Sequence, residues 1–456
     1  MVGFGSVGQG VLPLLLRHIE MKPEQIFIIT ADDKGIEIAR KYNVPHTIAP
    51  LTSNNYLQAL EPHLLPGNFL LNLSVDVCSF ALIEVCQKRG VLYLDSCIEP
   101  WIGGYTNTSL PAPERSDYAL REQALALRKP GKNPTAVLTH GANPGLVSHF
   151  LKQALLNIAV DTGESVDAPK TRDGWARLAQ ALGIRTIHIA ERDTQIANDR
   201  KKQNEFLNTW SVDGFISESC QPAELGWGSH ERHFPTDAKR YDFGVKSAIY
   251  LTRPGGSTRV RTWLPLAGET HGFLITHNEA ISIADYFTVG AGHTPEYRPT
   301  VHYAYHPCDD AVLSLHELAG RNWQAQTNRR VLKEEIISGM DELGVLVMGH
   351  ARNSYWYGSR LSTPEARELC PHNSATTLQI TSSVMAGVIW AMRNPTCGIV
   401  EPDEIPYDEV LRLCHPYLGK VVGVYSDWTP LKDRNFLFEE DIDREDPWQF
   451  KNFRVT

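Results

Sequence analysis

The sequence lacks the residue patterns that mark several specialised classes of protein. It has eight cysteines in 456 residues, none of them in a CxxC pair, and it contains no HExxH sequence. No cluster of cysteine and histidine has the spacing of a zinc site, so we expect no metal at the functional site. Scattered cysteines in a long chain are typical of buried thiols in a reducing compartment rather than of a disulfide framework.

Charge and hydropathy exclude further classes. The 44 basic residues face 53 acidic ones, for a net charge of −9, and no block of Lys or Arg is present. This balance disfavours nucleic acid and anionic membranes as partners. The longest apolar runs, residues 11–16 and 384–392, are much shorter than the ~20 residues needed to cross a bilayer. Because no secretory signal opens the chain either, we expect a cytoplasmic location.

The chain does have a glycine pattern at its start. Gly3, Gly5 and Gly8 form GxGxxG, in which the first glycine permits a tight turn and the second lets a pyrophosphate approach the backbone. The third lets the next helix pack closely on the strand, so that the helix N-terminus faces the phosphates. Only Met1 and Val2 precede the pattern, whereas a strand usually has about five residues. Either the first strand is a stub, or residues are missing before Met1.

The residues after the glycines fit a dinucleotide-binding unit. Residues 11–19 predict a helix, and residues 25–30 predict a strand that ends at Asp32 and Asp33. An acidic residue at this place binds the ribose hydroxyls of NAD and disfavours the extra phosphate of NADP. We expect Asp32 to take this role.

Alternating helices and strands continue to about residue 145. This order predicts an α/β domain over residues 1–145, with a Rossmann-type, doubly wound parallel sheet. Ligands of such sheets bind at the carboxyl ends of the strands. The polar segments expected at these ends are residues 74–76, 95–99 and 140–145. The expected helices are residues 36–42, 79–89 and 117–127, and the expected strands are residues 69–74, 91–95 and 136–139.

The pattern changes after residue 145. A helix is predicted over residues 146–159, and longer segments typical of strands follow, which indicates a second, α+β domain over residues 146–380. An apolar helix at residues 382–392 begins a C-terminal segment, near 380–456, that we expect to pack back on the first domain. Residues 438–446 carry six acids and predict a solvated surface segment. The four expected strands are residues 186–190, 248–252, 272–276 and 280–284.

One acidic stretch is a candidate binding site. Residues 203–231 contain five carboxylates and the aromatic residues Trp210, Phe215 and Trp227, but no Lys or Arg. Carboxylates with a tryptophan face suit an organic cation, because ion pairing and a cation–π contact act together. An acidic surface loop with tryptophans in the core would have the same composition. A substrate carboxylate would instead require cationic residues, and Arg192, Lys201 and Lys202 lie nearby.

Six segments of the sequence together resemble the bacterial homospermidine synthases. They are residues 3–13, 30–33, 72–76, 95–105, 139–145 and 224–231, and the similarity extends over nearly the whole chain. These synthases resemble the wider saccharopine dehydrogenase group, which pairs a Rossmann domain with an α+β domain used in substrate binding and dimerisation. The resemblance therefore implies the same architecture here, and a homodimer.

The resemblance also implies a transferase reaction without net redox. Tightly held NAD⁺ would accept a hydride from the carbon that bears one amine of putrescine, and the resulting imine would lose ammonia. A second putrescine would form a new imine with the retained carbon, which the NADH would reduce to sym-homospermidine. Spermidine is an alternative donor of the aminobutyl group. The chemistry belongs to the cofactor, while the protein orients the amine and supplies the electric field.

Roles for individual residues follow from the same resemblance. Trp210 would hold an ammonium or a cationic intermediate by a cation–π contact, and Glu218 would pair with an amine. Asn143 would orient the reacting amine near the nicotinamide, and His277 would transfer a proton or orient a group. The other residues of the expected pocket are Glu191, Asp341, Asp76 and Glu99. The residues expected to contact NAD are Gly3, Gly5, Ser6, Val7, Gly8, Asp32, Ser74, Asp76 and Thr139.

Protonation restricts this chemistry. Carboxylates raise the pKa of nearby amines, whereas an amine must lose a proton before it reacts. We therefore expect one end of the substrate to stay charged while the other end reacts beside Asn143, with a base that the sequence does not identify.

Two other functions fit part of the sequence. The opening glycine pattern also resembles homoserine dehydrogenase, and saccharopine-type or carboxyspermidine dehydrogenases share the architecture. Those enzymes turn over NAD(P)H and require cations for the substrate carboxylates, which residues 203–231 do not supply. A non-catalytic NAD-binding protein would keep the glycines but would not require Trp210, Glu218 and Asn143 together.

Overall fold

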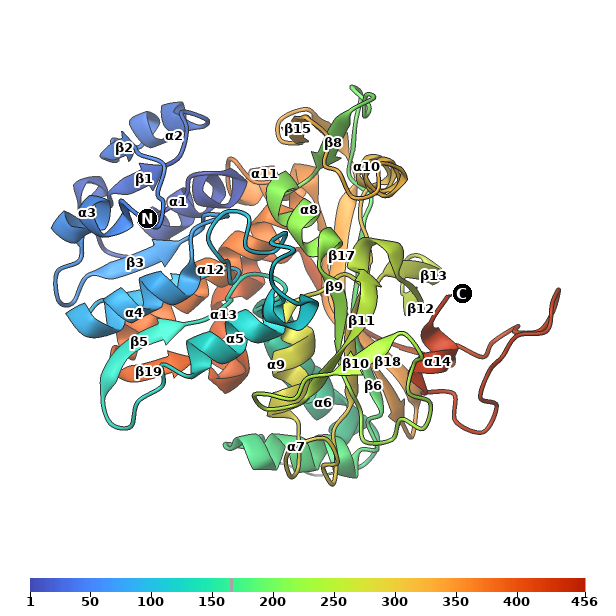
Figure 1. Cartoon of the computed structure of the whole chain (residues 1–456). Coiled ribbons are helices and arrows are strands. Elements are labelled where there is room, and N and C mark those ends of the chain that lie inside the picture. The colour runs from blue at the N-terminus through green and yellow to red at the C-terminus, as the bar shows by residue number, and fades with distance from the viewer. Residues whose placement is uncertain (165–166, 456) are drawn as a thin grey trace.

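A parallel sheet forms the centre of the N-terminal part of the molecule. Its strands lie in the order β2-β1-Val2-β3-β4-β5-β19, which is the strand order of a Rossmann sheet with one strand added at the edge. The computed structural model describes residues 1–164 and 167–455 (Figure 1). The strands are β1 (Ile28–Thr30), β2 (His46–Ile48), β3 (Phe69–Asn72), β4 (Leu92–Asp95), β5 (Asn133–Val137) and β19 (Cys397–Val400).

Val2 occupies the place of the first strand of this sheet. Val2 bridges Ile29 on one side and Asn72 on the other, both in parallel. The Val2 amide donates to the Leu71 carbonyl at 2.8 Å, and the Gly3 amide donates to that of Ile29 at 2.9 Å. The few residues before the glycine turn therefore still hold the centre of the sheet together.

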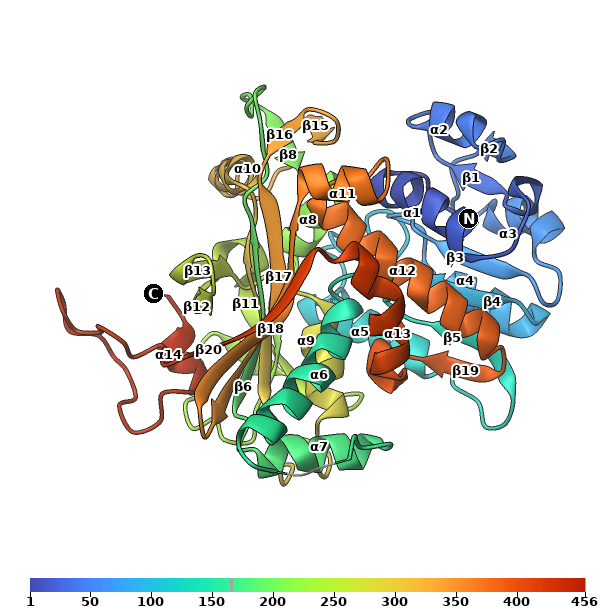
Figure 2. The ribbon, with the colours of Figure 1, turned by 180° about the vertical axis from the view of Figure 1, so that it is seen from behind.

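Helices cover both faces of the parallel sheet. On one face α12 packs against α1, β4 and β5, and on the other α4 and α5 pack together (Figures 1 and 2). By length and composition α12 is apolar enough to cross a membrane, but 89% of its apolar window is buried inside the protein, as in a core helix. The helices are α1 (Ser6–His18), α2 (Ile36–Lys41), α3 (Tyr56–Leu60), α4 (Ser79–Arg89), α5 (Asp117–Leu125) and α12 (Ala375–Arg393).

The second part of the molecule is built on a ten-stranded mixed sheet. Its main path is β10-β11-β9-β14-β6-β17-β18-β20, and the hairpin β12–β13 joins it at β14. Only the neighbours β14 and β6 run parallel along this path. The strands are β6 (Thr186–Asp193), β9 (Pro222–Gly226), β10 (Ala238–Arg240), β11 (Ala248–Pro254), β12 (Arg259–Leu264), β13 (Gly268–Phe273), β14 (Thr300–His306), β17 (Met340–His350), β18 (Asn353–Ser362) and β20 (Lys420–Ser426).

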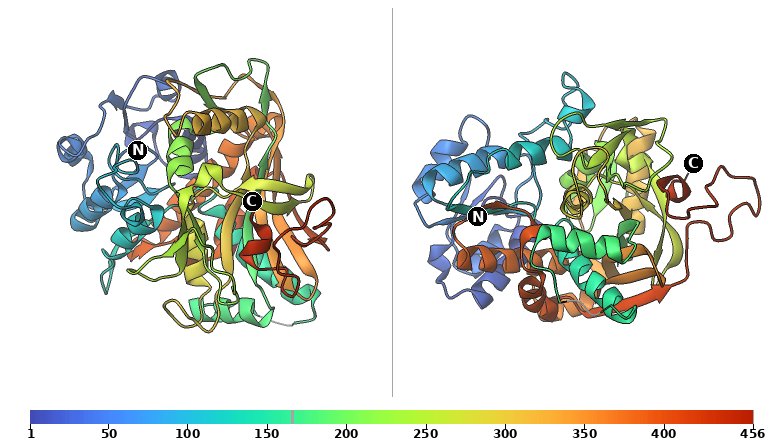
Figure 3. Two further views of the ribbon diagram at one scale, coloured as in Figure 1. Left: turned by 45° about the vertical axis from the view of Figure 1, so that its right-hand side comes forward. Right: turned by 90° about the horizontal axis from the view of Figure 1, so that it is seen from below.

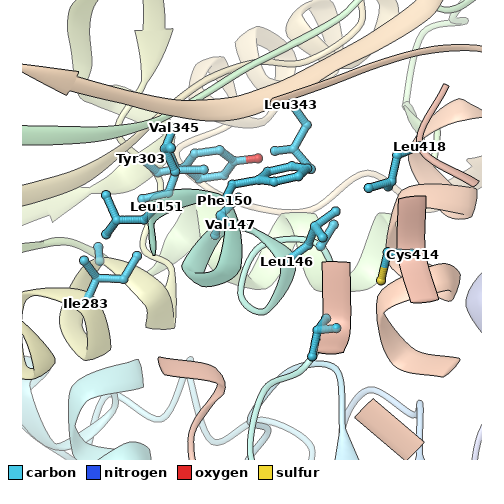
Figure 4. Packing of buried hydrophobic residues seen from close by; sticks show 14 of the residues in the cluster. Leu146, Val147, Phe150, Leu151, Ile283, Tyr303, Leu343, Val345, Cys414 and Leu418 are labelled. Carbon is cyan, nitrogen blue, oxygen red and sulfur yellow. The ribbon is translucent and has the colours of Figure 1, made fainter. Parts of the chain in front are cut away.

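The large sheet has an apolar core on each face. Figure 4 shows Phe150 and Leu151 of α6 packed beneath Tyr303, Leu343 and Val345 of the sheet. On the opposite face the β12–β13 hairpin and α14 cover a second cluster. Further helices of this part are α6 (Leu146–Asp161), α7 (Arg172–Ala181), α8 (Val212–Cys220), α9 (Asn278–Tyr286), α10 (Asp309–Gly320), α11 (Thr363–Leu369), α13 (Tyr407–Cys414) and α14 (Phe450–Phe453).

Two features differ from the expectations. The strand predicted at residues 280–284 is wrong, because these residues form the middle of α9. Alternating isoleucines gave the pattern of a strand there, but a short apolar run fits a fully buried helix equally well. The C-terminal segment also divides: α12 and β19 join the first part, whereas β20 and α14 belong to the second. The division between residues 145 and 146 stays a prediction.

A buried ion cluster ties the two parts together. The guanidinium of Arg121, from α5, is fully buried and donates to both Glu401 oxygens at 2.6 and 2.7 Å. It also donates to Asp285 of α9 at 2.8 Å. Arg121 thus neutralises Glu401, which follows β19 of the parallel sheet, and Asp285, which lies on α9 in the second part of the molecule.

We expect Arg121→Met to destabilise the protein by about 3–5 kcal/mol, because Glu401 would stay buried without its counter-charge and Asp285 would keep only Arg172 as a partner. Urea unfolding followed by circular dichroism measures the loss. The matched control is Arg177→Met, since Arg177 is half-exposed and pairs only with Asp173 on the same helix. That change should cost under about 1 kcal/mol. Equal midpoints for the two variants would contradict the linking role of the cluster.

Candidate functional site

A pocket opens between the two sheets, at the carboxyl end of β4. Carboxylates from three elements meet there: Glu99 from the loop after β4, Asp117 from the first turn of α5, and Glu218 from α8. His277, just before α9, supplies an imidazole. The lining contains no Lys or Arg and consists of Cys97, Ile98, Glu99, Tyr105, Asp117, Pro144, Ser217, Glu218, Gln221, His277 and Asn278.

His277 lies between two carboxylates. Its Nε2 is 3.1 Å from Glu218 Oε2, and its Nδ1 is 3.3 Å from Glu279 Oε1. Burial disfavours the imidazolium, but the carboxylates of Glu279 and Glu218 overcome that effect and raise the His277 pKa well above its usual value. The raised pKa favours the positively charged imidazolium form of His277. Its contact with Glu218 holds that carboxylate in one orientation at the pocket.

The other two pocket carboxylates are held close to neutral. Burial, together with the charge of Asp117, raises the pKa of Glu99 well above its usual value. Burial and the nearby Glu224 raise the pKa of Asp117 to about 8. Only the Tyr105 hydroxyl donates to the Asp117 side chain, at 3.1 Å. An ammonium entering this pocket would lower both pKa values, because it restores a counter-charge.

A second group of carboxylates lies deeper, where β6 and β17 pair. Glu191 and Asp193 stand on β6, and Asp341 is the register partner of Asp193 on β17. All three are buried. Burial raises the pKa of Glu191 to about 7 and that of Asp193 to about 6, and burial with repulsion from Glu191 raises that of Asp341. Asp341 Oδ2 accepts from the Thr376 hydroxyl at 2.6 Å, while its Oδ1 has no hydrogen-bond partner among the residues that the structure describes.

Polar and aromatic side chains connect the two acidic groups. Glu191 accepts a hydrogen bond from Asn143 Nδ2 at 3.1 Å and another from the Tyr303 hydroxyl. The ring of Tyr303 lies 4.4 Å from that of His277 and stacks on Tyr305 at 5.1 Å. The Trp210 indole donates to the Tyr305 hydroxyl at 3.3 Å. Contacts through Tyr303 and His277 thus connect Glu191 with Glu218.

The glycine turn has the shape that a dinucleotide requires. A Cβ on Gly3 would meet the Leu73 carbonyl at 2.6 Å, and one on Gly8 would meet the Gly3 carbonyl at 2.8 Å. A Cβ on Gly5 would meet nothing within 4 Å, which leaves open space beside the N-terminus of α1. No side chain caps this helix and no acid occupies its first turn. Its free amides therefore suit a pyrophosphate.

The other residues expected to contact NAD lie around the same edge. Ser6 and Val7 begin α1, and Thr139 receives the Asn278 amide on its hydroxyl at 3.0 Å. Ser74 and Asp76 follow β3, and burial raises the Asp76 pKa. Asp32 follows β1, is exposed, and pairs with Lys34 at 3.3 Å. The fold therefore brings these residues to one edge of the sheet.

Sequence reasoning missed several residues of the pocket. Asp117 begins the helix predicted at residues 117–127, where an acid is ordinary, and Glu279 directly precedes the segment 280–284 that was wrongly predicted as a strand. Tyr303 and Tyr305 alternate within β14, and that alternation was the available signal that both face one side. Of the cations that the sequence places near residues 203–231, Lys201 forms an ion pair with Glu317 and Lys202 forms one with Asp199.

Comparison with protein families assigns both parts of the chain. Residues 1–137 match the family described as the saccharopine dehydrogenase NADP binding domain. Residues 141–424 match the saccharopine dehydrogenase C-terminal domain. The saccharopine dehydrogenase of Saccharomyces cerevisiae has a similar fold, with a TM-score of 0.52 and 11% identity over 93% of this chain and 98% of that one.

Relatives that match the whole chain identify its family within the saccharopine dehydrogenase group. The chain is 51% identical to the homospermidine synthase of Blastochloris viridis and 49% identical to that of Mesorhizobium japonicum, over 100% of this chain and 96% of each relative. The crystal structure of the homospermidine synthase of Legionella pneumophila, solved in complex with NAD, has a TM-score of 0.93 and 47% identity, over 100% of this chain and 97% of that one. This chain therefore belongs to the homospermidine synthase family, within the saccharopine dehydrogenase group.

Proposed function

We propose that this chain catalyses the transfer of an aminobutyl group to putrescine, which yields sym-homospermidine and ammonia. The donor is a second putrescine or a spermidine. The observation that carries the proposal is a pair of neighbouring acidic groups: one lines a pocket with no Lys or Arg in its lining, and the other lies behind it, where Asn143 and Tyr303 bind Glu191 and the Tyr303 ring contacts His277. Such a site attracts an extended polyamine and repels a substrate carboxylate. Family membership supports the same reaction.

The cofactor is NAD, bound at the open N-terminus of α1, and it supplies the removal and the return of a hydride. Gly3, Gly5 and Gly8 shape the turn for its pyrophosphate, and Asp32 binds a ribose hydroxyl. A substrate bound between the acidic groups lies next to Thr139 and Asn143, which follow β5 at the cofactor edge of the sheet. In this proposal the reacting amine lies between the nicotinamide and Glu191.

Glu191 is the residue best suited to move the proton. Its pKa of about 7 lets it exchange a proton near neutral pH, which is the requirement for a general acid or base. The Asn143 amide orients the carboxylate at 3.1 Å. Glu218, oriented by the protonated His277, then holds the other end of the substrate as an ammonium, and the face of Trp210 stabilises a cation between them.

Product analysis tests this function. Purified protein with putrescine and a catalytic amount of NAD⁺ should form homospermidine and an equal amount of ammonia, as measured by mass spectrometry and an ammonia assay. The absorbance of NADH should not rise, because the hydride returns to the product. Steady growth of NADH without homospermidine would instead identify a dehydrogenase with net redox.

Trp210 provides the matched variants for this assay. Trp210→Ala removes the aromatic face and should lower kcat/KM by ~30-fold, the equivalent of a cation–π contact of ~2 kcal/mol, whereas Trp210→Phe should keep part of the activity. Both variants should still bind NAD. A wild-type rate for the alanine variant would exclude a role for Trp210 in holding the cation.

The pH dependence tests the assignment of Glu191. Below a pH of about 7 Glu191 is protonated and neutral, and above it the carboxylate is charged. We therefore expect kcat/KM for putrescine to rise as pH rises through 7, and Glu191→Gln to be slow without that inflection. Glu342→Gln is the control, since Glu342 is also buried on the paired strand but binds Arg360 at 2.9 Å. An unchanged inflection in Glu191→Gln would assign the titration to another group.

We also propose that the protein is a cytoplasmic homodimer. The segment between β20 and α14 extends away from the body (Figure 3), and its Phe436, Leu437 and Phe438 are 85%, 76% and 82% exposed. The ion pair of Arg434 and Glu440, at 2.6 Å, closes the base of this loop. Adjacent exposed apolar side chains mark a protein interface, and a second copy is the commonest partner. Eight unpaired cysteines support a reducing compartment.

A further inference from the structure

Two short parallel strands lead to residues that contact the start of α1. They are β8 (Glu205–Asn208) and β15 (Asn328–Val331), which pair in register beside α10 (Figure 1). Because the strands are parallel, their carboxyl ends lie side by side. Trp210 follows the end of β8 by two residues, and Lys333 follows β15 by two residues. The second part of the molecule thus sends two segments toward the cofactor edge of the parallel sheet.

Both segments contact the first turns of α1. The Ser6 hydroxyl donates to the Trp210 carbonyl at 3.0 Å, and Lys333 Nζ donates to Gln9 Oε1 at 2.8 Å. Ser6 and Gln9 are three residues apart on the helix, so they lie on one face. They flank Gly8, and Gly5 precedes Ser6. The contacts therefore bracket the turn that shapes the pyrophosphate site.

Lys333 is held in place from both sides. The Arg367 guanidinium donates to the Lys333 carbonyl at 2.8 Å and to the Ile336 carbonyl at 2.9 Å. The partner Gln9 is fixed as well, since its Nε2 donates to the Phe4 carbonyl at 2.8 Å. Lys333 is half-buried, and burial lowers the pKa of its ammonium. Because other hydrogen bonds hold both residues, the contact of Lys333 with Gln9 joins two ordered groups, unlike a pair of mobile side chains on the surface.

A third connection lies along the same edge. Arg329, on β15, forms an ion pair with Asp213 of α8. Its positive charge also opposes the rise of the Asp76 pKa, which places the guanidinium near the loop after β3. We name residues 328–338 the strap, because they lead from β15 past α1 to β16 (Ile336–Ser338).

We propose that the strap retains NAD between the two hydride transfers, with Lys333 as its positioning residue. The inference rests on the proposed function, in which NADH made from one amine must remain bound until the second imine forms. Departure of the dinucleotide from the glycine turn requires the strap to lift, which breaks the contact of Lys333 with Gln9. Lys333 acts through Gln9 and α1, so its effect is on cofactor release rather than on the chemical step.

The rate of NADH release tests the strap directly. Protein loaded with NADH is mixed with excess NAD⁺ in a stopped-flow fluorimeter, and the decay of bound NADH fluorescence gives the dissociation rate. Lys333→Met keeps the length of the side chain but removes the donor, and we expect release to accelerate at least 10-fold. Lys333→Arg should restore slow release. In turnover with putrescine, the methionine variant should also lose more free NADH per homospermidine formed.

Two controls separate retention from general damage. Lys202→Met removes a lysine whose ammonium pairs only with Asp199 near β8, and it should release NADH at the wild-type rate. Combining Lys333→Met with Gln9→Leu should add little to the single change, because both remove one contact. Unchanged release in Lys333→Met at an unchanged Tm would overturn the proposal, as would equal acceleration in Lys202→Met. Slow NADH release that depends on Lys333, in a protein that makes no homospermidine, would overturn the proposed function alone.

Discussion

Burial of carboxylates with no Lys or Arg among them is the constraint on which the site depends. Glu99, Asp117 and Glu218 surround one pocket, while Glu191, Asp193 and Asp341 lie behind it, and desolvation raises the pKa of every one of them. His277 supplies a positive charge to Glu218. Isolated charges in such surroundings cost several kcal/mol each, so the other carboxylates hold protons more strongly than they would in water. A polyamine supplies the missing positive charge. Its ammonium groups can displace these protons, which couples binding of the substrate to proton movement.

Hydrogen bonds and ion pairs outside the pocket hold the elements that carry the pocket carboxylates in place. Glu224 accepts the backbone amides of Asp117 and Tyr118 at 3.1 and 3.2 Å, and so fixes the start of α5 against the large sheet. The Arg121 cluster fixes the other end of the same region. The Glu224 and Arg121 contacts thus fix α5 in the wall of the pocket without using the pocket carboxylates as partners. Those carboxylates therefore stay available to a ligand.

The sequence predicts the cofactor half of the site better than the substrate half. GxGxxG acts locally, since each glycine serves a contact within a few residues of chain, and the structure shows those contacts at Gly3 and Gly8. Composition alone predicts an acidic site at residues 203–231, but of these carboxylates only Glu218 lines the described pocket, whereas Glu205 and Asp213 pair with Arg330 and Arg329. By contrast, Asp193 and Asp341 meet only because β6 pairs with β17, and Asp117 enters the pocket only because α5 docks on Glu224. Long-range register of this kind leaves no periodic signal in the chain.

Retention of the dinucleotide and exclusion of water follow from the same geometry. An imine between the two hydride transfers would hydrolyse if water entered freely, and a closed site prevents such side reactions. The glycine turn alone leaves α1 open on one side, because nothing lies within 4 Å of a Cβ on Gly5. The residues that contact the start of α1 from the second part of the molecule, Trp210 and Lys333, follow β8 and β15. The Trp210 indole donates to Tyr305, beside the acidic groups, and its carbonyl accepts from Ser6, so one residue connects the acidic groups with the cofactor turn. A movement of Trp210 on substrate binding would therefore alter the hydrogen bond between its carbonyl and Ser6 at the cofactor turn.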